Sequence, residues 1–280
     1  MKVGLLQLNV GDEPVANLPI TRRYLREAVA QCAKFVLTPE VTNCISSSRE
    51  QQQQTLSPEA EDMTLAALRQ DAAELGIWLL IGSLALKTDD PDGRLANRSF
   101  LIGPDGGIKA RYDKIHMFDV QVSETETYRE SASFRPGKRA VLVETPFAKI
   151  GMSVCYDVRF PHLYRALAHA GAEILTIPAA FSAVTGAAHW ESLLRARAIE
   201  NTCFVLAPAQ TGTHSGSHKH PRRTYGHSMV VSPWGEVLHD AATEAGVSII
   251  DLDMQQVAQA RQRIASLNHD QPFDAPDRMT

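Results

Sequence analysis

Three side chains with complementary chemistry lie just beyond predicted strands. They are Glu40 after residues 35–37, Lys114 after residues 108–113 and Cys155 after residues 149–154. The apolar runs 35–37 and 149–154 predict buried β-strands, and residues 108–112 are predicted as the second strand of a hairpin. Because ligand sites in α/β proteins gather beyond the carboxyl ends of strands, we expect the three side chains to meet in one cleft.

The chemistry expected of this trio is nucleophilic attack on a carbonyl carbon. A cysteine thiol has an ordinary pKa near ~8.5, so it needs a neighbouring cation or base to react as a thiolate at neutral pH. Lys114 can supply the cation and can stabilise the oxyanion that develops on the carbonyl. Glu40 can accept the thiol proton, protonate the leaving nitrogen and then activate the water that cleaves the thioester.

The other three cysteines have contexts that predict different roles. Cys32 is predicted on the apolar stripe of a helix, Cys203 lies inside an apolar run, and Cys44 falls in a polar loop. Free cysteine usually behaves as a small buried hydrophobe. Four cysteines without paired spacing do not predict a disulfide framework in a chain of 280 residues, so we expect a reducing compartment, the cytoplasm.

The elements that must position the trio alternate between helical and extended patterns. Apolar spacing, Pro and Gly predict helices over 14–32, 57–75, 161–170 and 188–201. Strands are predicted over 1–10, 35–37, 77–86, 98–102, 108–112, 140–143, 149–154, 173–177, 203–207, 227–231 and 247–250. This order predicts an α/β protein with mixed sheets flanked by helices.

Composition narrows the class of partner. A content of 44% hydrophobic residues over 280 residues is enough to bury a full core. With 28 Lys and Arg against 32 Asp and Glu, the formal charge of -4 argues against nucleic acid and favours a small molecule. No cleavage site follows the first apolar run. The most apolar stretch, 166–188, is interrupted by His169, Glu173 and Pro178, so no membrane span is predicted.

Three motifs resemble those of the nitrilase, or carbon-nitrogen hydrolase, superfamily, whose active site is a Glu-Lys-Cys triad. They are Leu37 to Glu40, Tyr112 to Asp119 and Cys155 to Pro161, within a similarity that extends over residues 2–265. The resemblance implies a four-layer α-β-β-α sandwich with mixed sheets, built as a single domain over 1–280 with a C-terminal tail. It also implies no metal or organic cofactor, and assembly as a homodimer.

The resemblance extends to two supporting groups. Glu130 precedes Arg135-Pro136-Gly137, as a second glutamate does in family members, and its implied role is to orient Lys114 and the hydrolytic water. The backbone N–H of Tyr156 is the implied oxyanion donor beside Lys114.

Segments 180–191 and 193–200 look like the Nit branch of the superfamily, which includes omega-amidases and deaminated-glutathione amidases. Segments 209–214 and 225–231 favour the second group. The implied reaction is hydrolysis of deaminated glutathione to 2-oxoglutarate and Cys-Gly, a metabolite-repair reaction. The alternatives are an omega-amidase acting on 2-oxoglutaramate, another C–N hydrolase such as an N-carbamoyl amino acid hydrolase, and a catalytically silent scaffold.

Deaminated glutathione carries a carboxylate at each end, so its site needs cations or several donors away from the reacting carbonyl. Arg159, Arg222 and Arg223 are candidates, and Thr185 is a further one by resemblance. The alternative is that Arg159 braces the turn after Cys155 through an ion pair and that the other two arginines face solvent.

Two polar segments are predicted as loops. Residues 46–54 are expected to form a solvated connection, and residues 211–223 a mobile lid or an exposed loop. The second segment contains His214, His218 and His220, but no Cys or carboxylate cluster accompanies them, so a zinc site is the weaker hypothesis. Glu124 and Glu126 are assigned to the surface.

Overall fold

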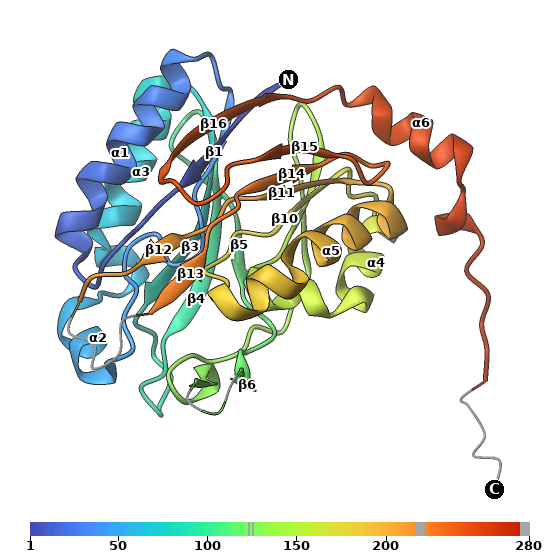
Figure 1. The fold of residues 1–280 in the computed structure, drawn as a ribbon. Helices are drawn as coiled ribbons and strands as arrows, with labels where there is room; N and C mark the ends of the chain where they lie inside the picture. The colour runs from blue at the N-terminus through green and yellow to red at the C-terminus, as the bar shows by residue number, and fades with distance from the viewer. Residues whose placement is uncertain (123, 125, 217–221, 275–280) are drawn as a thin grey trace, which may run out of the picture.

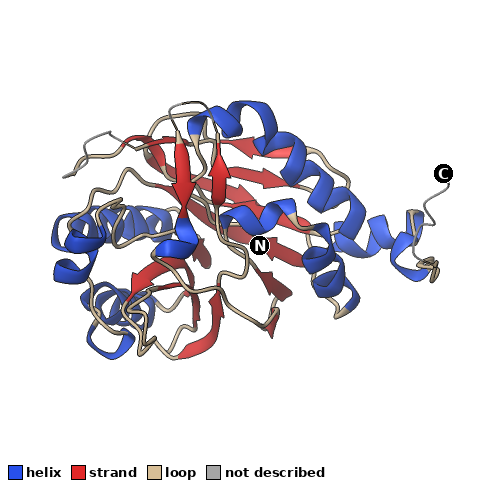
Figure 2. Cartoon of the chain, turned by 90° about the horizontal axis from the view of Figure 1, so that it is seen from below, coloured by secondary structure: helices blue, strands red, loops and turns tan. Residues whose placement is uncertain are grey.

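A computed structural model describes residues 1–122, 124, 126–216 and 222–274 of the chain. Two six-stranded sheets face each other, and helices cover both outer sides (Figure 1). Helices α1 and α3 lie against the first sheet, and α4 and α5 lie against the second. The view turned by 90° shows helices on opposite sides of the strands as well (Figure 2). The predicted α-β-β-α sandwich with mixed sheets is confirmed.

The elements have the following bounds. The helices are α1 Pro14–Ala30, α2 Arg49–Thr55, α3 Met63–Leu75, α4 Pro161–His169, α5 Ala183–Asn201 and α6 Gln255–Arg263, with short 3-10 helices η1 Glu59–Glu61, η2 Glu130–Ala132, η3 Cys155–Arg159 and η4 Ser266–Asn268. The strands are β1 Lys2–Gln7, β2 Phe35–Leu37, β3 Trp78–Leu86, β4 Ala96–Ile102, β5 Ile108–Asp113, β6 Asp119–Gln121, β7 Thr127–Arg129, β8 Val141–Glu144, β9 Lys149–Met152, β10 Ile174–Thr176, β11 Phe204–Ala207, β12 Thr211–Thr213, β13 Arg223–Tyr225, β14 Met229–Val231, β15 Val237–Asp240 and β16 Gly246–Asp251.

Strand direction decides where the reactive side chains emerge. The first sheet has the order β16-β1-β2-β3-β4-β5, and the second has the order β15-β14-β11-β10-β9-β8. Strand β2 is parallel to β3, while β4 is antiparallel to both β3 and β5. Strands β2 and β5 therefore run in the same direction, and the segments that carry Glu40 and Lys114 leave the first sheet at the same edge.

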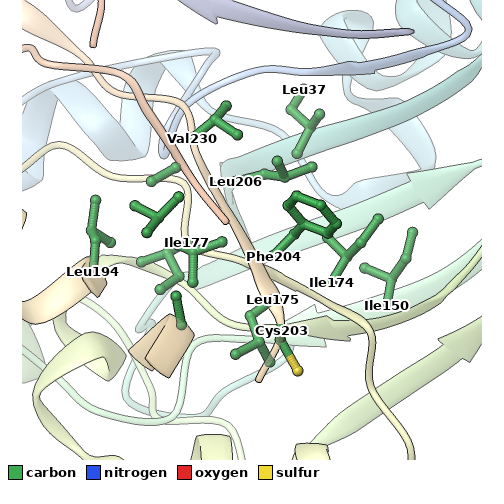
Figure 3. Packing of buried hydrophobic residues seen from close by; sticks show 14 of the residues in the cluster. Leu37, Ile150, Ile174, Leu175, Ile177, Leu194, Cys203, Phe204, Leu206 and Val230 are labelled. Carbon is green, nitrogen blue, oxygen red and sulfur yellow. The ribbon is translucent and has the colours of Figure 1, made fainter. Parts of the chain in front are cut away.

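Strands β2 and β3 of the first sheet are apolar on both faces because both faces are covered there. Phe35 and Leu37 pack toward the second sheet, whereas Val36 between them belongs to the cluster that includes α1 and α3. Figure 3 shows Leu37 in the same cluster as Phe204 and Leu206 of the second sheet. Burial on both sides explains why the strands appear as continuous hydrophobic runs in the sequence.

Several local predictions were wrong. Helix α1 ends at Ala30, and Cys32 is exposed with a positive φ of 71°, so it is not on an apolar stripe. Helix α3 begins at Met63 and not near Ser57, because the Asp62 carboxylate accepts a hydrogen bond from the Leu65 N–H (2.7 Å) and caps the helix there.

The two segments predicted as loops contain regular structure. Residues Arg49–Thr55 form α2, which Ser48 caps by accepting a hydrogen bond from the Gln51 N–H (3.2 Å). The ends of segment 211–223 pair as the antiparallel strands β12 and β13. Strands β6, β7 and β15 and helix α6 were not predicted. Among the described residues, none of the helices combines the length and apolar character needed to cross a membrane.

Candidate active site

The structure brings Glu40, Lys114, Cys155 and Glu130 together between the two sheets. The Lys114 Nζ donates to Glu40 Oε1 at 2.8 Å and lies 2.9 Å from both carboxylate oxygens of Glu130. Glu40, Lys114 and Cys155 are buried, with exposed fractions of 3%, 2% and 7%. One ammonium is thus held between two carboxylates, beside a buried thiol.

Glu40 is positioned by an irregularity in the neighbouring strand β3. The register of β3 shifts between Ile81 and Leu84, and at this shift Ser83 Oγ accepts a hydrogen bond from the Val41 N–H (2.8 Å). A Cβ on Gly82 would lie 2.0 Å from the carbonyl oxygen of Thr38, so only glycine permits this approach. A glycine inside an apolar strand pattern is the sequence signal that could have identified this contact.

Lys114 is fixed through its own backbone. Its N–H donates to the carbonyl of Asn97 (3.0 Å), and its carbonyl accepts from the Gly137 N–H (2.7 Å). A Cβ on Gly137 would lie 2.1 Å from the Asp113 carbonyl oxygen. The Pro-Gly segment therefore packs directly on the end of β5. It connects to the 3-10 helix that carries Glu130, whose carboxylate also accepts from the Phe118 N–H (2.6 Å).

Cys155 begins the 3-10 helix η3 in a left-handed conformation, with φ of 49°. Such a backbone costs a non-glycine residue about 1–3 kcal/mol, so surrounding contacts must hold it. The Cys155 N–H donates to the Pro178 carbonyl (2.9 Å). Buried Asp157 accepts from the Val154 N–H (2.9 Å) and from the Tyr112 hydroxyl (2.7 Å), and thereby links the Cys155 turn to strand β5.

The protonation states follow from burial and close charges. Burial raises the pKa of Glu40, but the Lys114 ammonium outweighs it and holds that pKa at about 2. Burial lowers the pKa of Lys114, but the charges of Glu130 and Glu40 raise it above its ordinary value. Burial and the Glu40 charge raise the pKa of the Cys155 thiol well above its ordinary value, and Lys114 only partly opposes them. The resting site is a thiol, a carboxylate and an ammonium, so Lys114 does not by itself produce a resting thiolate.

The remaining hydrogen bonds to Glu40 come from residues that the sequence did not single out. Asn97 Nδ2 donates to Glu40 Oε1 (2.9 Å) and lies 3.3 Å from Glu130 Oε1. The Ala180 N–H donates to Glu40 Oε2 (2.8 Å), and Gln210 Nε2 donates to the Glu40 backbone carbonyl (3.0 Å). Both carboxylate oxygens are therefore oriented. Asn97 stands beside Arg98 and Ser99 at the polar start of β4, so no local pattern in the sequence distinguished it.

A cavity of about 960 Å³ is lined by Glu40, Lys114, Cys155 and Glu130. Cavities of this size accommodate whole metabolites. Four of the predicted ligand-contacting residues also line it, namely Tyr156, Thr185, Arg222 and Arg223.

Arg222 and Thr185 present polar atoms that have no hydrogen-bond partner in the described part of the chain. The Arg222 Nη2 donates to the Ala180 carbonyl (2.9 Å), but its buried Nε is unpaired. The Thr185 hydroxyl is buried and unpaired as well. Buried polar atoms are normally satisfied, so these two are exceptions, and both belong to residues that line the cavity.

Arg159 is not among the described residues that line the cavity. Its guanidinium lies over the rings of Tyr156 (6.0 Å) and Phe181 (5.4 Å), and its Nη2 is 3.2 Å from Nδ1 of His189. The structure therefore supports the bracing alternative for Arg159, although the bracing contacts are aromatic rings and a histidine and not a carboxylate.

The assignment of Glu126 to the surface was wrong. Glu126 lines the cavity and accepts hydrogen bonds from the Tyr128 hydroxyl (2.5 Å) and the Ser182 hydroxyl (3.1 Å). Burial raises the pKa of Tyr128 to about 12, so its hydroxyl remains a donor at neutral pH. Glu124 is exposed, as expected.

The histidines proposed for zinc have no such arrangement in the described part of segment 211–223. His214 is buried, with Nδ1 2.7 Å from the Val10 carbonyl and Nε2 2.6 Å from the Thr224 hydroxyl. His218 and His220 lie outside the described residues. Within the described ranges, no group of three or more His, Cys, Asp or Glu side chains could hold a metal ion.

Residues 2–262 match the family model for carbon-nitrogen hydrolase. The chain is 39% identical over 266 residues to the deaminated glutathione amidase of Synechocystis sp. (strain PCC 6803 / GT-S), with coverage of 94% of this chain and 96% of that relative. It is 34% identical over 263 residues to the omega-amidase NIT2 of Homo sapiens, with coverage of 94% and 92%.

Two solved structures share the fold. The C. elegans NitFhit protein superposes with a TM-score of 0.87 at 32% identity, over 96% of this chain, which spans 64% of that protein. A glutamate-to-glutamine mutant of the amidase from Nesterenkonia sp. AN1 superposes with a TM-score of 0.77 at 25% identity, over 95% of this chain and 98% of that one. That amidase carries acrylamide, added by Michael addition, on its active-site cysteine.

Proposed function

This chain belongs to the carbon-nitrogen hydrolase family, and we propose that it hydrolyses deaminated glutathione to 2-oxoglutarate and Cys-Gly through a thioester on Cys155. The observation that carries the proposal is the buried Glu40–Lys114–Glu130 network beside Cys155, facing a cavity of about 960 Å³. The Nesterenkonia amidase modified at its active-site cysteine supports the choice of Cys155 as nucleophile.

In the acylation step, the Cys155 sulfur attacks the amide carbon while its proton passes to Glu40. Because burial raises the pKa of the thiol and Lys114 holds the pKa of Glu40 at about 2, a free thiolate is unfavourable in the resting site. The proton therefore leaves as the C–S bond forms. Glu40 then gives the proton to the leaving nitrogen, the C–N bond breaks and the acyl group remains on sulfur.

Lys114 and the Tyr156 backbone N–H stabilise the oxyanion. An ammonium has three donors. One meets Glu40 Oε1 at 2.8 Å, and Glu130 can share a second between oxygens that are both 2.9 Å away. This leaves the third for the carbonyl oxygen, where a fixed charge strengthens as negative charge develops.

In deacylation, Glu40 takes a proton from water as the water oxygen attacks the thioester, and the proton then passes to the departing sulfur. Glu130 holds Lys114 in place during both halves of the reaction. Asn97 Nδ2 donates to Glu40 Oε1 and lies 3.3 Å from Glu130 Oε1, so it holds the two carboxylates in a fixed position relative to each other.

The substrate assignment rests on the relatives and on the residues that line the cavity. The Synechocystis deaminated glutathione amidase is 39% identical, against 34% for the human omega-amidase. Arg222, Arg223 and Thr185 offer cationic and hydroxyl contacts for a carboxylate, and Arg222 Nε and the Thr185 hydroxyl have no partner among the described residues. Omega-amidase activity on 2-oxoglutaramate is the competing function.

We propose further that residues 1–280 act as one catalytic unit and that the protein is a cytoplasmic homodimer. The dimer is supported by exposed apolar side chains on the helical side of the second sheet, Ile199 (51%), Trp234 (43%) and Ile264 (52%). A molar mass of one chain in light scattering at micromolar concentration would refute the dimer.

The function is tested by comparing kcat/KM for deaminated glutathione, 2-oxoglutaramate and an N-carbamoyl amino acid. We expect the first to be preferred, and a wide preference for 2-oxoglutaramate would contradict the assignment. Cys155→Ala should abolish turnover while the protein stays folded. Mass spectrometry of the quenched reaction should show the 2-oxoglutaryl group on Cys155, whichever of the first two substrates is used.

A further inference from the structure

Helix α2 supplies part of the cavity wall, although its sequence is polar. Gln52 of this helix is only 5% exposed and lines the cavity. Its Nε2 donates to the Ser46 carbonyl (2.9 Å), while its Oε1 is buried and has no hydrogen-bond partner among the described residues. A buried amide oxygen without a partner is costly to a protein, so a donor from a ligand would be favourable there.

The orientation of the Gln52 amide is determined by its surroundings. If the amide were turned over, its oxygen would face the Ser46 carbonyl oxygen, and two acceptors would meet. Helix α2 is also held in place, because Gln51 Nε2 donates to the Asp12 carbonyl (2.6 Å). The unpaired polar atom of Gln52, a residue that lines the cavity, is therefore an acceptor and not a donor.

The wall around Gln52 carries no charge. It consists of Val41, Cys44, Ile45, Ser46, Ser47, Ser48 and Gln52, and we call it the neutral wall. The charged lining residues outside the catalytic network are Glu126, Arg129, Arg222 and Arg223, from other segments of the described chain. The neutral wall begins at the residue after Glu40, the group that protonates the leaving nitrogen.

We propose that the neutral wall is the subsite for the uncharged part of the amine half of the substrate and that Gln52 Oε1 accepts the glycyl N–H of a Cys-Gly leaving group. This inference rests on the proposed function. A peptide amine retains an amide N–H after the scissile nitrogen, whereas ammonia, the leaving group of an omega-amidase substrate, has nothing to place against the wall. Gln52 is thus a specificity determinant for peptidic amines.

Deaminated glutathione and 2-oxoglutaramate provide a matched test because they yield the same acyl group and differ only in the amine. For Gln52→Leu, we expect kcat/KM for deaminated glutathione relative to that for 2-oxoglutaramate to fall about tenfold. Gln54→Leu is the control, since Gln54 is exposed on the same helix and its Nε2 bonds to Glu50 (3.3 Å). An equal fall for both substrates with Gln52→Leu would mean that Gln52 only supports the structure, and would overturn the proposal.

A substrate analogue tests the same bond without altering the protein. In a depsipeptide of deaminated glutathione, glycolate replaces glycine and an ester oxygen replaces the glycyl N–H. The unaltered protein should lose about tenfold in kcat/KM on this analogue, and Gln52→Leu should add no further loss, as expected when both changes remove one interaction. Additive losses, or an unaffected analogue, would overturn the glycyl N–H assignment. If the unaltered protein cleaves 2-oxoglutaramate but not deaminated glutathione, the proposed function itself fails.

Discussion

Gly82→Ala tests whether the irregularity in β3 positions the catalytic carboxylate. The new Cβ would lie 2.0 Å from the Thr38 carbonyl oxygen, 2.5 Å from the Pro39 carbonyl oxygen and 2.6 Å from the Pro178 Cβ. These neighbours are two backbone oxygens and a proline ring, none of which can rotate away. Because Cβ contacts under 3.0 Å are essentially never seen, the backbone must move by about 1 Å.

That movement falls on the segment that ends in Glu40. A displacement of about 1 Å in a catalytic group costs roughly 100-fold in rate, and overpacking of a buried site costs about 1–3 kcal/mol of stability. We therefore expect Gly82→Ala to lower kcat/KM about 100-fold while the protein remains folded. Steady-state kinetics with deaminated glutathione measures the first effect, and urea denaturation measures the second.

The matched control is Gly246→Ala in strand β16, where an added Cβ meets nothing within 4 Å. It should change kcat/KM by no more than about threefold, because its main effect is to restrict the backbone of the unfolded chain. If Gly82→Ala kept the activity of the control, the contact of β3 with the Thr38–Pro39 backbone would not be what holds Glu40. If Gly82→Ala unfolded while Gly246→Ala stayed folded, Gly82 would be needed for stability. Gly82→Ser, which adds the same Cβ, should then unfold as well.

Three further predictions concern the network and its charges. Asn97→Leu should lower kcat/KM about tenfold or more with little change in KM for 2-oxoglutaramate, because a donor to Glu40 is lost; unchanged kcat would exclude the bridging role. The Lys114 ammonium lowers the pKa of Glu40 from 4.5 to about 2. The ionised Glu40 carboxylate therefore contributes about 3 kcal/mol to the free energy of unfolding, and this contribution is fully present above pH 4.5 and is lost as the pH falls toward 2. Between those pH values the unfolding free energy should therefore fall more steeply than in Glu40→Gln, and parallel curves would contradict the shift. Asp71→Asn should lower the free energy of unfolding by about 1–2 kcal/mol, because the fully buried Asp71 carboxylate binds two partly exposed arginines of α1 at 2.7 and 2.8 Å. The control Asp105→Asn, at an exposed ion pair with Lys109, should cost almost nothing.

The sequence alone determined the reactive groups and the layers that carry them. Glu40, Lys114 and Cys155 could be selected because each lies just beyond a predicted strand, and burial of both faces of β2 and β9 made two of those strands continuous apolar runs. Local patterns report burial and periodicity, and these fix the type and order of most elements. The start of α3 was missed because Asp62 is a capping residue as competent as Ser57.

Tertiary structure decided which residues meet across distant parts of the chain. Gln52 was predicted in a solvated loop, yet it belongs to helix α2, which is anchored at Asp12, and it lines the cavity. Arg159 follows the nucleophile turn, but aromatic neighbours hold it outside the residues that line the cavity. Likewise, burial raises the pKa of the Cys155 thiol, although the Lys114 ammonium acts to lower it. Contacts and desolvation of this kind arise only when separate strands and helices pack, and for that reason no local pattern in the sequence carries them.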